Sequence, residues 1–428
     1  MERRSFSIAK KTGHPFTRGE TAGISGGSCS AFPRSIEANN PVKLKGENQM
    51  DFLLSGIMSV TWQQIVMYGI GGLLIYLAIA KEFEPALLMP MGFGAILVNL
   101  PLTGVLDQVL QGGIEAQGII QWLFQTTIEA SEALPILLFI GIGAMIDFGP
   151  LLSNPKMMVF GAAAQFGIFF TISLAALFGF DLKDAACIGI IGAADGPTSI
   201  MVSQIFKSQY MGAIAVAAYS YMALVPIIQP MAIKLVTTRK ERCIRMHYNP
   251  KNITKTTRIL FPILVTIIAG LVAPMSVSLV GFLMFGNLLR ECGVLNSLAQ
   301  TAQNEFANII TLLLGITISF SMQAEQFVTW ETFLIMGLGL IAFIFDSIGG
   351  CLFAKLLNLF LKEKINPMIG AAGISAFPMS ARVIQKMALK EDNQNHLLMH
   401  AIGANVSGQI GSVIAGGIVL YLVPQFVK

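Results

Sequence analysis

The chain has 428 residues, of which 54% are hydrophobic and only 12% are charged. Soluble globular proteins carry about 25% charged residues, so the composition excludes an ordinary soluble enzyme and predicts a polytopic, all-α membrane protein. The net charge is +4, but residues 1–49 carry eight Lys and Arg against four Glu, which leaves the remainder neutral. No basic face for nucleic acid remains outside that segment.

Residues 1–49 are polar, rich in Gly and Ser, and lack hydrophobic periodicity, which predicts a disordered basic N-terminal extension. They also lack the apolar core of a signal peptide. Met50 is a candidate start of the mature protein, and a regulatory tail is the alternative. The membrane domain is expected to occupy residues 50–428.

Apolar stretches of roughly 20 residues, the length needed to cross a bilayer, recur from residue 62 onward. We expect about eleven membrane-embedded segments. They lie near 62–80, 86–102, 134–148, 157–179, 184–206, 211–233, 258–280, 305–322, 332–359, 366–388 and 396–423. Residues 104–131 are too polar to span and are expected at a surface, whereas 281–300 are too mixed to assign. The loop 234–258 holds eight basic residues against Glu241 alone, which predicts a cytoplasmic location.

The segment 184–206 is interrupted at its middle. Asp195 is followed by Gly196 and Pro197, which do not continue a regular helix, and then by Thr198, where a second half-helix can begin. A carboxylate at membrane depth costs roughly 2.5–3.5 kcal/mol on insertion scales, and such residues are usually functional. The alternative is that Asp195 only caps the second half-helix or lies near a membrane surface.

The segment 366–388 resembles this interrupted helix. Residues 191–194 and 369–372 both read Ile-Gly-Ala-Ala, and residues 137–148 resemble 312–323 at nearly the same offset. Two repeats that each contain a discontinuous helix are typical of secondary transporters, whose sites lie where the breaks meet. The alternative is that small-residue strings recur by chance in closely packed membrane helices.

Several polar residues share the expected membrane depth of Asp195. They are Tyr219, Tyr221, Asn366, Ser375, Arg382 and Asn405. Each also has a structural explanation: a buried tyrosine or asparagine can make one hydrogen bond, and Arg382 can extend to the cytoplasmic surface instead of holding a carboxylate. Asp147 and Asp346 are ranked lower, as nearer the ends of spans.

Carboxylate, hydroxyl and amide oxygens suit alkali cations, so sodium or a proton is the expected coupling ion. No Gly-x-x-x-x-Gly-Lys-Ser/Thr loop occurs, which argues against direct use of ATP. The five cysteines are scattered, and His396 and His400 have no third ligand in view, so neither predicts a metal site.

Long strings of the chain resemble the β subunit of biotin-dependent, sodium-translocating decarboxylases of the oxaloacetate, methylmalonyl-CoA and glutaconyl-CoA types. The strings are residues 141–155, 161–169, 188–198, 212–226 and 365–379. The resemblance runs from about residue 60 to the end. It implies a fold with inverted repeats, here about 132–233 and 303–423.

The resemblance also implies an activity. This subunit decarboxylates carboxybiotin that a separate biotinylated carrier (α) subunit delivers, exports Na⁺ and consumes a proton. The implied partners are that carrier, a small γ-type membrane subunit, membrane lipid and further copies of the chain, in the inner membrane of a bacterial or archaeal cell. The chain itself has no Ala-Met-Lys-Met site for biotin attachment.

The family's functional residues fall on matching positions of this sequence. The sodium ligands fall on Asp195, Asn405, Ser375 and Gly370. The catalytic residues fall on Tyr221, rather than Tyr219, and on Arg382 and Ser375, and the carboxybiotin-binding residues fall on Arg382 and Asn366.

The sequence leaves the acyl substrate open. Some oxaloacetate-type relatives carry a longer segment where this chain has only residues 104–131, and the α subunit selects the substrate. A stand-alone sodium-coupled carboxylate transporter is the main alternative function. A purely structural membrane scaffold would leave Asp195 unexplained.

Overall fold

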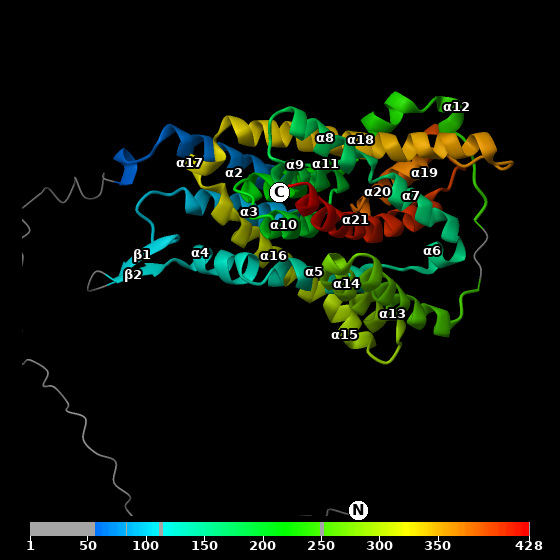
Figure 1. Ribbon diagram of the computed structural model, residues 1–428, viewed down its shortest axis with the longest axis horizontal. Coiled ribbons are helices and arrows are strands. Elements are labelled where there is room, and N and C mark those ends of the chain that lie inside the picture. The colour runs from blue at the N-terminus through cyan, green and yellow to red at the C-terminus, as the bar shows by residue number, and fades with distance from the viewer. Residues whose placement is uncertain (1–55, 83, 111–113, 249–251, 428) are drawn as a thin grey trace, which may run out of the picture. The chain divides into compact units, whose positions relative to one another are not determined.

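The computed structural model describes residues 56–82, 84–110, 114–248 and 252–427, and within them the chain is almost entirely helical (Figure 1). The expected N-terminal extension, residues 1–49, lies outside the described residues. The one sheet in the described part is an antiparallel hairpin of β1 (Asp107–Leu110) and β2 (Ile114–Gln117). The predicted all-α class is therefore confirmed, with this small hairpin as an addition.

Seven helical runs of the described chain are long and apolar enough to cross a membrane. Five are α2 (Trp62–Ala80), α11 (Met211–Val236), α13 (Lys255–Val272), α18 (Trp330–Phe360) and α21 (Leu398–Phe426). Another run joins η2 (Pro155–Met157), α7 (Met158–Ala163) and α8 (Phe166–Leu177). The last joins α15 (Asn296–Thr301), η5 (Ala302–Phe306), α16 (Ala307–Ile318) and η6 (Ser319–Met322). A polytopic membrane protein follows, while the expected count of eleven embedded segments stays a prediction.

The polar stretch 104–131 is only partly the surface segment that the sequence predicts. After the hairpin, α4 (Ile119–Phe124) and η1 (Gln125–Glu129) form one helical run that meets α5 (Ala133–Met145) at a bend of 68°. Together the two runs pass the length and composition test for a single bent span. The sequence did not predict this bent span, because acidic side chains interrupt the apolar run.

The unassigned stretch 281–300 contains most of α14 (Val277–Glu291), which packs tightly against α5. A methyl group on Gly143 would lie 1.9 Å from the Leu283 carbonyl oxygen, and one on Gly286 would lie 2.0 Å from that of Ile140. The polar residue Asn287 donates to the Ile146 carbonyl at 2.9 Å, which satisfies the end of α5. The mixed polarity of α14 thus serves helix packing.

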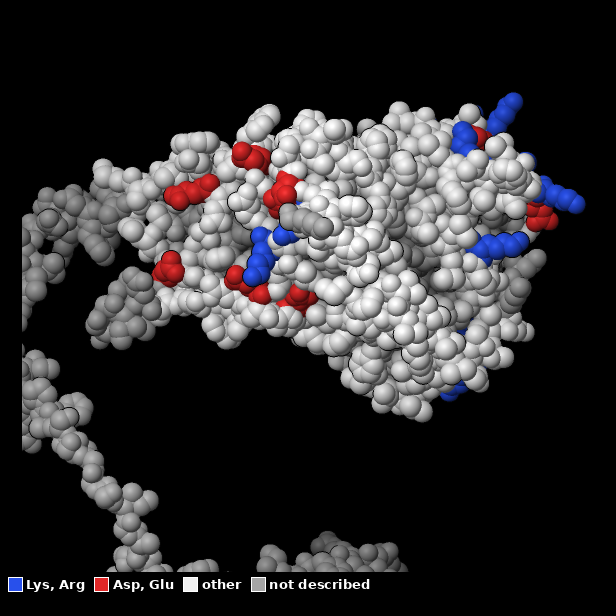
Figure 2. All heavy atoms as spheres, in the orientation of Figure 1, with Lys and Arg blue, Asp and Glu red and all other residues white. Residues whose placement is uncertain are grey.

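Other helices are too short to cross a membrane by themselves. They include α3 (Pro85–Val98), α6 (Gly149–Ser153), α12 (Arg239–Arg242), η4 (Pro274–Ser276) and α17 (Ala324–Phe327). Figure 2 shows basic side chains at the end of the molecule that carries α12, and no charged side chain over α21 in this view. This distribution is consistent with a cytoplasmic loop 234–258, which stays a prediction.

Both predicted helix breaks are present. The first separates α9 (Leu182–Ile190) and the turn η3 (Ile191–Ala193) from α10 (Gly196–Ile205), and the second separates α19 (Met368–Ala371) from α20 (Met379–Glu391). The breaks touch, since the Ser375 N–H donates to the Ala193 carbonyl at 3.0 Å. Whether the two halves form an inverted repeat stays a prediction.

Candidate ion-binding site at the two helix breaks

Asp195 is the first residue after a sharp reversal of the chain. Ala194 has a left-handed backbone (φ +52°), and Asp195 is extended as the N-cap of α10. Its Oδ1 accepts the Thr198 N–H at 3.3 Å, the usual bond of an aspartate N-cap. Gly196 and Pro197 follow at the first helical positions, where the missing N–H of proline costs nothing. Asp195 therefore does cap the half-helix, yet its side chain is only 3% exposed inside a membrane protein.

Three hydroxyl groups converge on the other oxygen of this carboxylate. Thr198 Oγ1 and Ser412 Oγ each lie 2.8 Å from Asp195 Oδ2, and Ser375 Oγ lies 3.3 Å away. The three residues come from α10, α21 and the second break, and Ser412 Oγ also lies 3.0 Å from Ser375 Oγ. A hydroxyl group can turn from donating to the carboxylate to offering its lone pairs, so the same oxygens can ligate a cation. The cluster supplies the hard oxygen ligands that sodium requires.

Two amide side chains of α21 add unused acceptors beside this cluster. Asn405 Nδ2 donates to the Ile374 carbonyl at 2.7 Å, and Gln409 Nε2 donates to the carbonyl and the hydroxyl group of Ser375. Both amide oxygens, Asn405 Oδ1 and Gln409 Oε1, are buried without a hydrogen-bond partner in the described chain. Buried polar atoms are normally paired. Gln409 contacts Ser375 of the cluster directly, so its orphaned oxygen fits a site for a small cation, whereas Asn405 contacts Ile374, the residue before Ser375.

The two tyrosines of α11 lie on different sides of that helix. The Tyr219 ring covers Gly196, where an added methyl group would lie 2.2 Å from the ring, and its buried hydroxyl group has no partner among the described residues. The Tyr221 hydroxyl group donates to the Met336 carbonyl of α18. Tyr219 is thus the tyrosine beside Asp195, although the sequence resemblance assigns the functional role to Tyr221.

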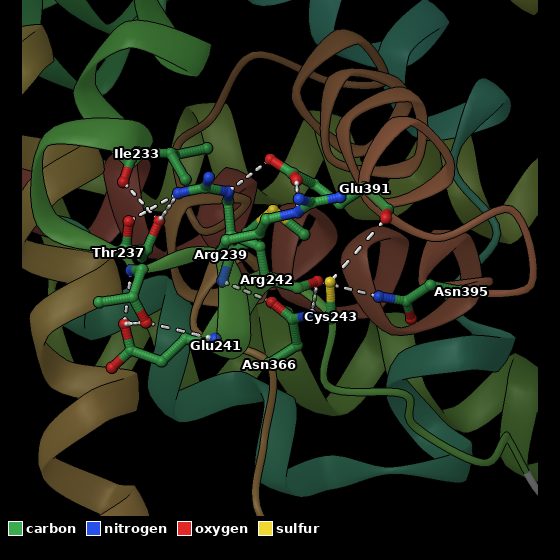
Figure 3. A network of polar contacts seen from close by, with 11 residues as sticks. Ile233, Thr237, Arg239, Glu241, Arg242, Cys243, Asn366, Glu391 and Asn395 are labelled. Atoms are coloured by element: carbon green, nitrogen blue, oxygen red, sulfur yellow. Dashed lines mark hydrogen bonds and ion pairs between the residues drawn. The ribbon is translucent and has the colours of Figure 1, made fainter.

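Other predicted site residues lie outside the Asp195 cluster. Gly370 packs against α18, since a methyl group on Gly370 would lie 1.9 Å from the Gly350 carbonyl oxygen. Asn366 belongs to the polar network around α12 (Figure 3), where its Nδ2 donates to the carbonyls of Arg242 at 2.8 Å and Ile244 at 2.9 Å. The structure thus brings Ser375 to Asp195 and places Asn405 against Ile374, the residue before Ser375. The roles proposed for the remaining residues stay predictions.

Arg382 lies on α20 and is exposed. Its guanidinium group makes no hydrogen bond or ion pair with the described part of the chain. The positive charge of Arg382 acts on Glu84 at the start of α3. Burial raises the pKa of Glu84, and the charge of Arg382 partly offsets that rise. An exposed guanidinium without a partner is available to a ligand carboxylate.

Sequence reasoning missed two members of the cluster, Ser412 and Gln409. With Asn405 they follow the spacing i, i+4, i+7 along α21, which places them on one face of the helix. That polar stripe in an apolar segment was the available signal. Sequence reasoning also placed Asp346 near a span end, but it lies near the middle of α18 and is fully buried. Asp147 does lie beyond the end of α5, 3.7 Å from Arg258.

Comparison with known proteins assigns the chain to a family. Residues 63–423 match the family model described as Na⁺-transporting oxaloacetate decarboxylase beta subunit. The chain belongs to this family. It is therefore the membrane subunit of a sodium-pumping decarboxylase, which is a multisubunit enzyme.

Individual relatives agree with that assignment. The chain is 47% identical to the methylmalonyl-CoA decarboxylase subunit beta of Propionigenium modestum, across 87% of this chain and 98% of the relative. It is 46% identical to the glutaconyl-CoA decarboxylase subunit beta of Acidaminococcus fermentans, across 86% and 96%. A probable oxaloacetate decarboxylase beta chain of Vibrio cholerae is 42% identical across 85% and 96%. Relatives from three substrate types thus share this membrane subunit.

Proposed function

We propose that this subunit removes the carboxyl group from carboxybiotin and couples that reaction to Na⁺ export through the cluster around Asp195. The observation that carries the proposal is the convergence of three hydroxyl groups on Asp195 Oδ2, beside the unpaired amide oxygens of Asn405 and Gln409. Sodium is the transported substrate of this site. Its side-chain ligands would be Asp195, Ser375 and Asn405.

The sodium site lies between parts of the chain that belong to different elements. Asp195 precedes α10, Ser375 lies in the second break, and Ser412 lies on α21. A movement of one broken helix against the other would therefore separate the ligands and release the ion. Gly370, proposed as a further contributor, would act through its close contact with Gly350.

The chemical step needs a group that holds the substrate and a group that supplies a proton. We assign the first role to Arg382, whose side chain is exposed and unpaired in the described structure, with Asn366 contributing to the binding of carboxybiotin and Ser375 to the chemical step. Loss of CO₂ leaves a basic ureido nitrogen that takes up one proton. Tyr221 is the proposed donor, acting as a general acid.

The proposal requires partners that this chain does not contain. A biotinylated carrier subunit delivers the carboxyl group from the cytoplasm, and a small γ-type membrane subunit and further copies of this chain complete the complex. We place the complex in the inner membrane of a bacterial or archaeal cell. The relatives' names support decarboxylation of an acyl-CoA or a keto acid. The α subunit would determine which substrate is decarboxylated.

A pull-down with avidin detection tests this assembly. The chain is purified in mild detergent from cells that also express the proposed partner subunits, and the eluate is probed for biotin. We expect a co-purifying biotinylated subunit, together with Na⁺ uptake into proteoliposomes that avidin blocks. Avidin-insensitive uptake by the chain alone would instead establish a stand-alone sodium-coupled carboxylate transporter.

A further inference from the structure

A second carboxyl group lies buried near the ion site, on a different helix. Asp346 is fully buried near the middle of α18. Its Oδ1 accepts the Gly167 N–H at 2.5 Å, and its Oδ2 has no hydrogen-bond partner among the described residues. The predicted sodium ligands do not include it, so its retention in a membrane-spanning helix needs another explanation.

The surroundings of the two buried carboxyl groups differ in a chemically informative way. Asp195 receives three hydroxyl groups and a backbone N–H, which stabilise its charged form. An ionised Asp346 would keep charge on Oδ2 with no donor facing it, in an apolar interior. Paired acids in such unlike environments take different protonation states. Asp346 thus has fewer donors than Asp195 to stabilise a negative charge, which makes it the candidate to carry a proton.

No charged partner replaces the missing donors. The elements packed against this part of α18 are α7, α8, α9, α11, α19 and η3. Of these, α7, α8, α19 and η3 contain no titratable side chain. The other two contribute Lys183, Asp184 and Cys187 from α9, and Tyr219, Tyr221 and Lys234 from α11. None of these hydrogen-bonds to Asp346 in the described structure, and Lys355 of α18 itself is engaged with Val236 and Glu241.

The position of Asp346 connects it to the ion site. A methyl group on Gly192 would lie 2.6 Å from Asp346 Oδ2, so the carboxyl group rests directly on the turn η3. The Ala193 carbonyl of that turn accepts the Ser375 N–H, and Asp195 lies two residues after Ala193 in the chain. A change in the charge of Asp346 therefore acts on η3, the turn that leads directly to the proposed sodium ligand Asp195.

We propose that Asp346 is a proton-binding site whose proton is exchanged with water during the transport cycle, coupled through η3 to the cation at Asp195. In the exchange the carboxyl O–H bond breaks, the carboxylate keeps the electron pair and the proton leaves to water. An ionised Asp346 adds negative charge near the cation, so sodium binding and proton release favour each other, as linkage requires. The inference rests on the proposed function, which places sodium at Asp195.

The test measures protons released when NaCl is added to the weakly buffered, purified complex, with a pH-sensitive dye as the readout. The wild-type complex is expected to release protons, and Asp346→Asn, which keeps an acceptor for Gly167, is expected to release about one fewer per chain. Ser347→Ala is the matched control, since Ser347 is an equally buried neighbour on the same helix. Undiminished release from Asp346→Asn would overturn the proposal.

Sodium binding is measured in the same samples by isothermal titration, which separates the two possible failures. A wild-type complex that binds no sodium contradicts the proposed function, whereas sodium binding with unchanged proton release in Asp346→Asn contradicts only the role of Asp346. If Asp346→Asn does not fold, infrared difference spectra of the wild-type complex replace it. A carboxyl C=O band lost on sodium addition supports the proposal, and its persistence overturns it.

Discussion

Ser412 holds one of the two shortest side-chain hydrogen bonds to Asp195, and it does so from the last long helix of the chain. Its hydroxyl group also lies 3.0 Å from that of Ser375, so it joins both breaks to α21. In the proposed sodium site, Ser412 would hold the ion ligands in place before sodium binds. A preorganised set of oxygens binds more tightly than one that must be assembled.

Replacing Ser412 with Ala removes that hydrogen bond without adding bulk. Loss of a hydrogen bond to a charged group costs about 1.5–3 kcal/mol, so we expect the half-saturating Na⁺ concentration for CO₂ release to rise about tenfold or more. Ser407→Ala on the same helix is the control, because the Ser407 hydroxyl group donates to the Met158 carbonyl away from the cluster. Equal effects of the two substitutions would contradict a role for Ser412 at the ion site.

Tyr219 and Tyr221 provide a second comparison at the residue scale. If Tyr221 is the proton donor, Tyr221→Phe lowers kcat by about 10²–10⁴ with little change in the Na⁺ requirement. Tyr219→Phe removes a hydroxyl group that has no partner in the described structure and should lower kcat far less. Measured kcat values of purified complexes decide this. The reverse order would transfer the proton donation to Tyr219, the tyrosine that lies beside Asp195.

At the scale of elements, the second broken helix is held by close backbone contact. Gly370 of α19 and Gly350 of α18 each face the other's carbonyl oxygen, at 1.9 Å and 2.1 Å from the positions that added methyl groups would take. Only glycine fits both sides of such an approach. The contact fixes α19, and hence the start of the break that carries Ser375.

Gly370→Ala should therefore lower the stability of the whole protein and not only weaken ion binding. Overpacking typically costs about 1–3 kcal/mol, and we expect a lower Tm of the detergent-solubilised complex together with reduced activity. Gly337→Ala, on α18, is the control, because a methyl group there meets nothing within 4 Å. A normal Tm with weakened Na⁺ binding would instead favour a direct role of Gly370 in ligation.

The loop after α11 is tied to the end of α20 by an ion pair with a pH dependence. Arg245 Nε lies 2.6 Å from Asp392 Oδ2, and these hydrogen bonds hold the pKa of Asp392 below its ordinary value. A carboxyl group with a depressed pKa contributes stability above its unfolded pKa, about 3.9, and loses it as the pH falls through the folded value. Wild-type protein should thus exceed Asp392→Asn in Tm at neutral pH, with the gap closing as the pH falls below the unfolded pKa of about 3.9 and through the lower folded value. A gap that persists in acid would contradict this.

The network around α12 extends this attachment to the second broken helix (Figure 3). Arg242 donates to Glu391 at 2.8 Å, and its carbonyl accepts from both Asn366 and Asn395. These contacts join the loop, α20 and the start of the second broken segment. Arg382, the residue proposed to bind the substrate carboxylate, lies on that same α20.

For the whole molecule, the sequence predicted most of the architecture because apolar length and small-residue breaks are local signals. The breaks at Asp195 and before α20 are confirmed, since Gly and Pro interrupt helices wherever they fold. Contacts that join distant segments were out of reach: the approach of Ser412 and Gln409 to Ser375 depends on how α21 packs. Likewise, the placement of Tyr219 rather than Tyr221 beside Asp195 depends on the rotation of α11 about its axis.

In the proposed mechanism, the subunit couples decarboxylation at the cytoplasmic side to the movement of an ion held within the membrane. The family assignment establishes a membrane subunit of a sodium-pumping decarboxylase, and the cluster at the two breaks is the proposed sodium site. The carboxylate of Asp195 would be the charged centre of that site. If it is neutralised, the hydroxyl and amide oxygens remain, but the cation loses its counter-charge.

Radioactive sodium uptake by proteoliposomes that contain the complete complex with Asp195→Asn, measured together with CO₂ release, tests the central claim most directly. Asn has nearly the same shape and keeps an oxygen for the Thr198 cap. The account predicts that sodium-dependent uptake and sodium-stimulated CO₂ release are both lost, while the complex still assembles with its biotinylated partner. Wild-type uptake and CO₂ release in this variant would contradict the account.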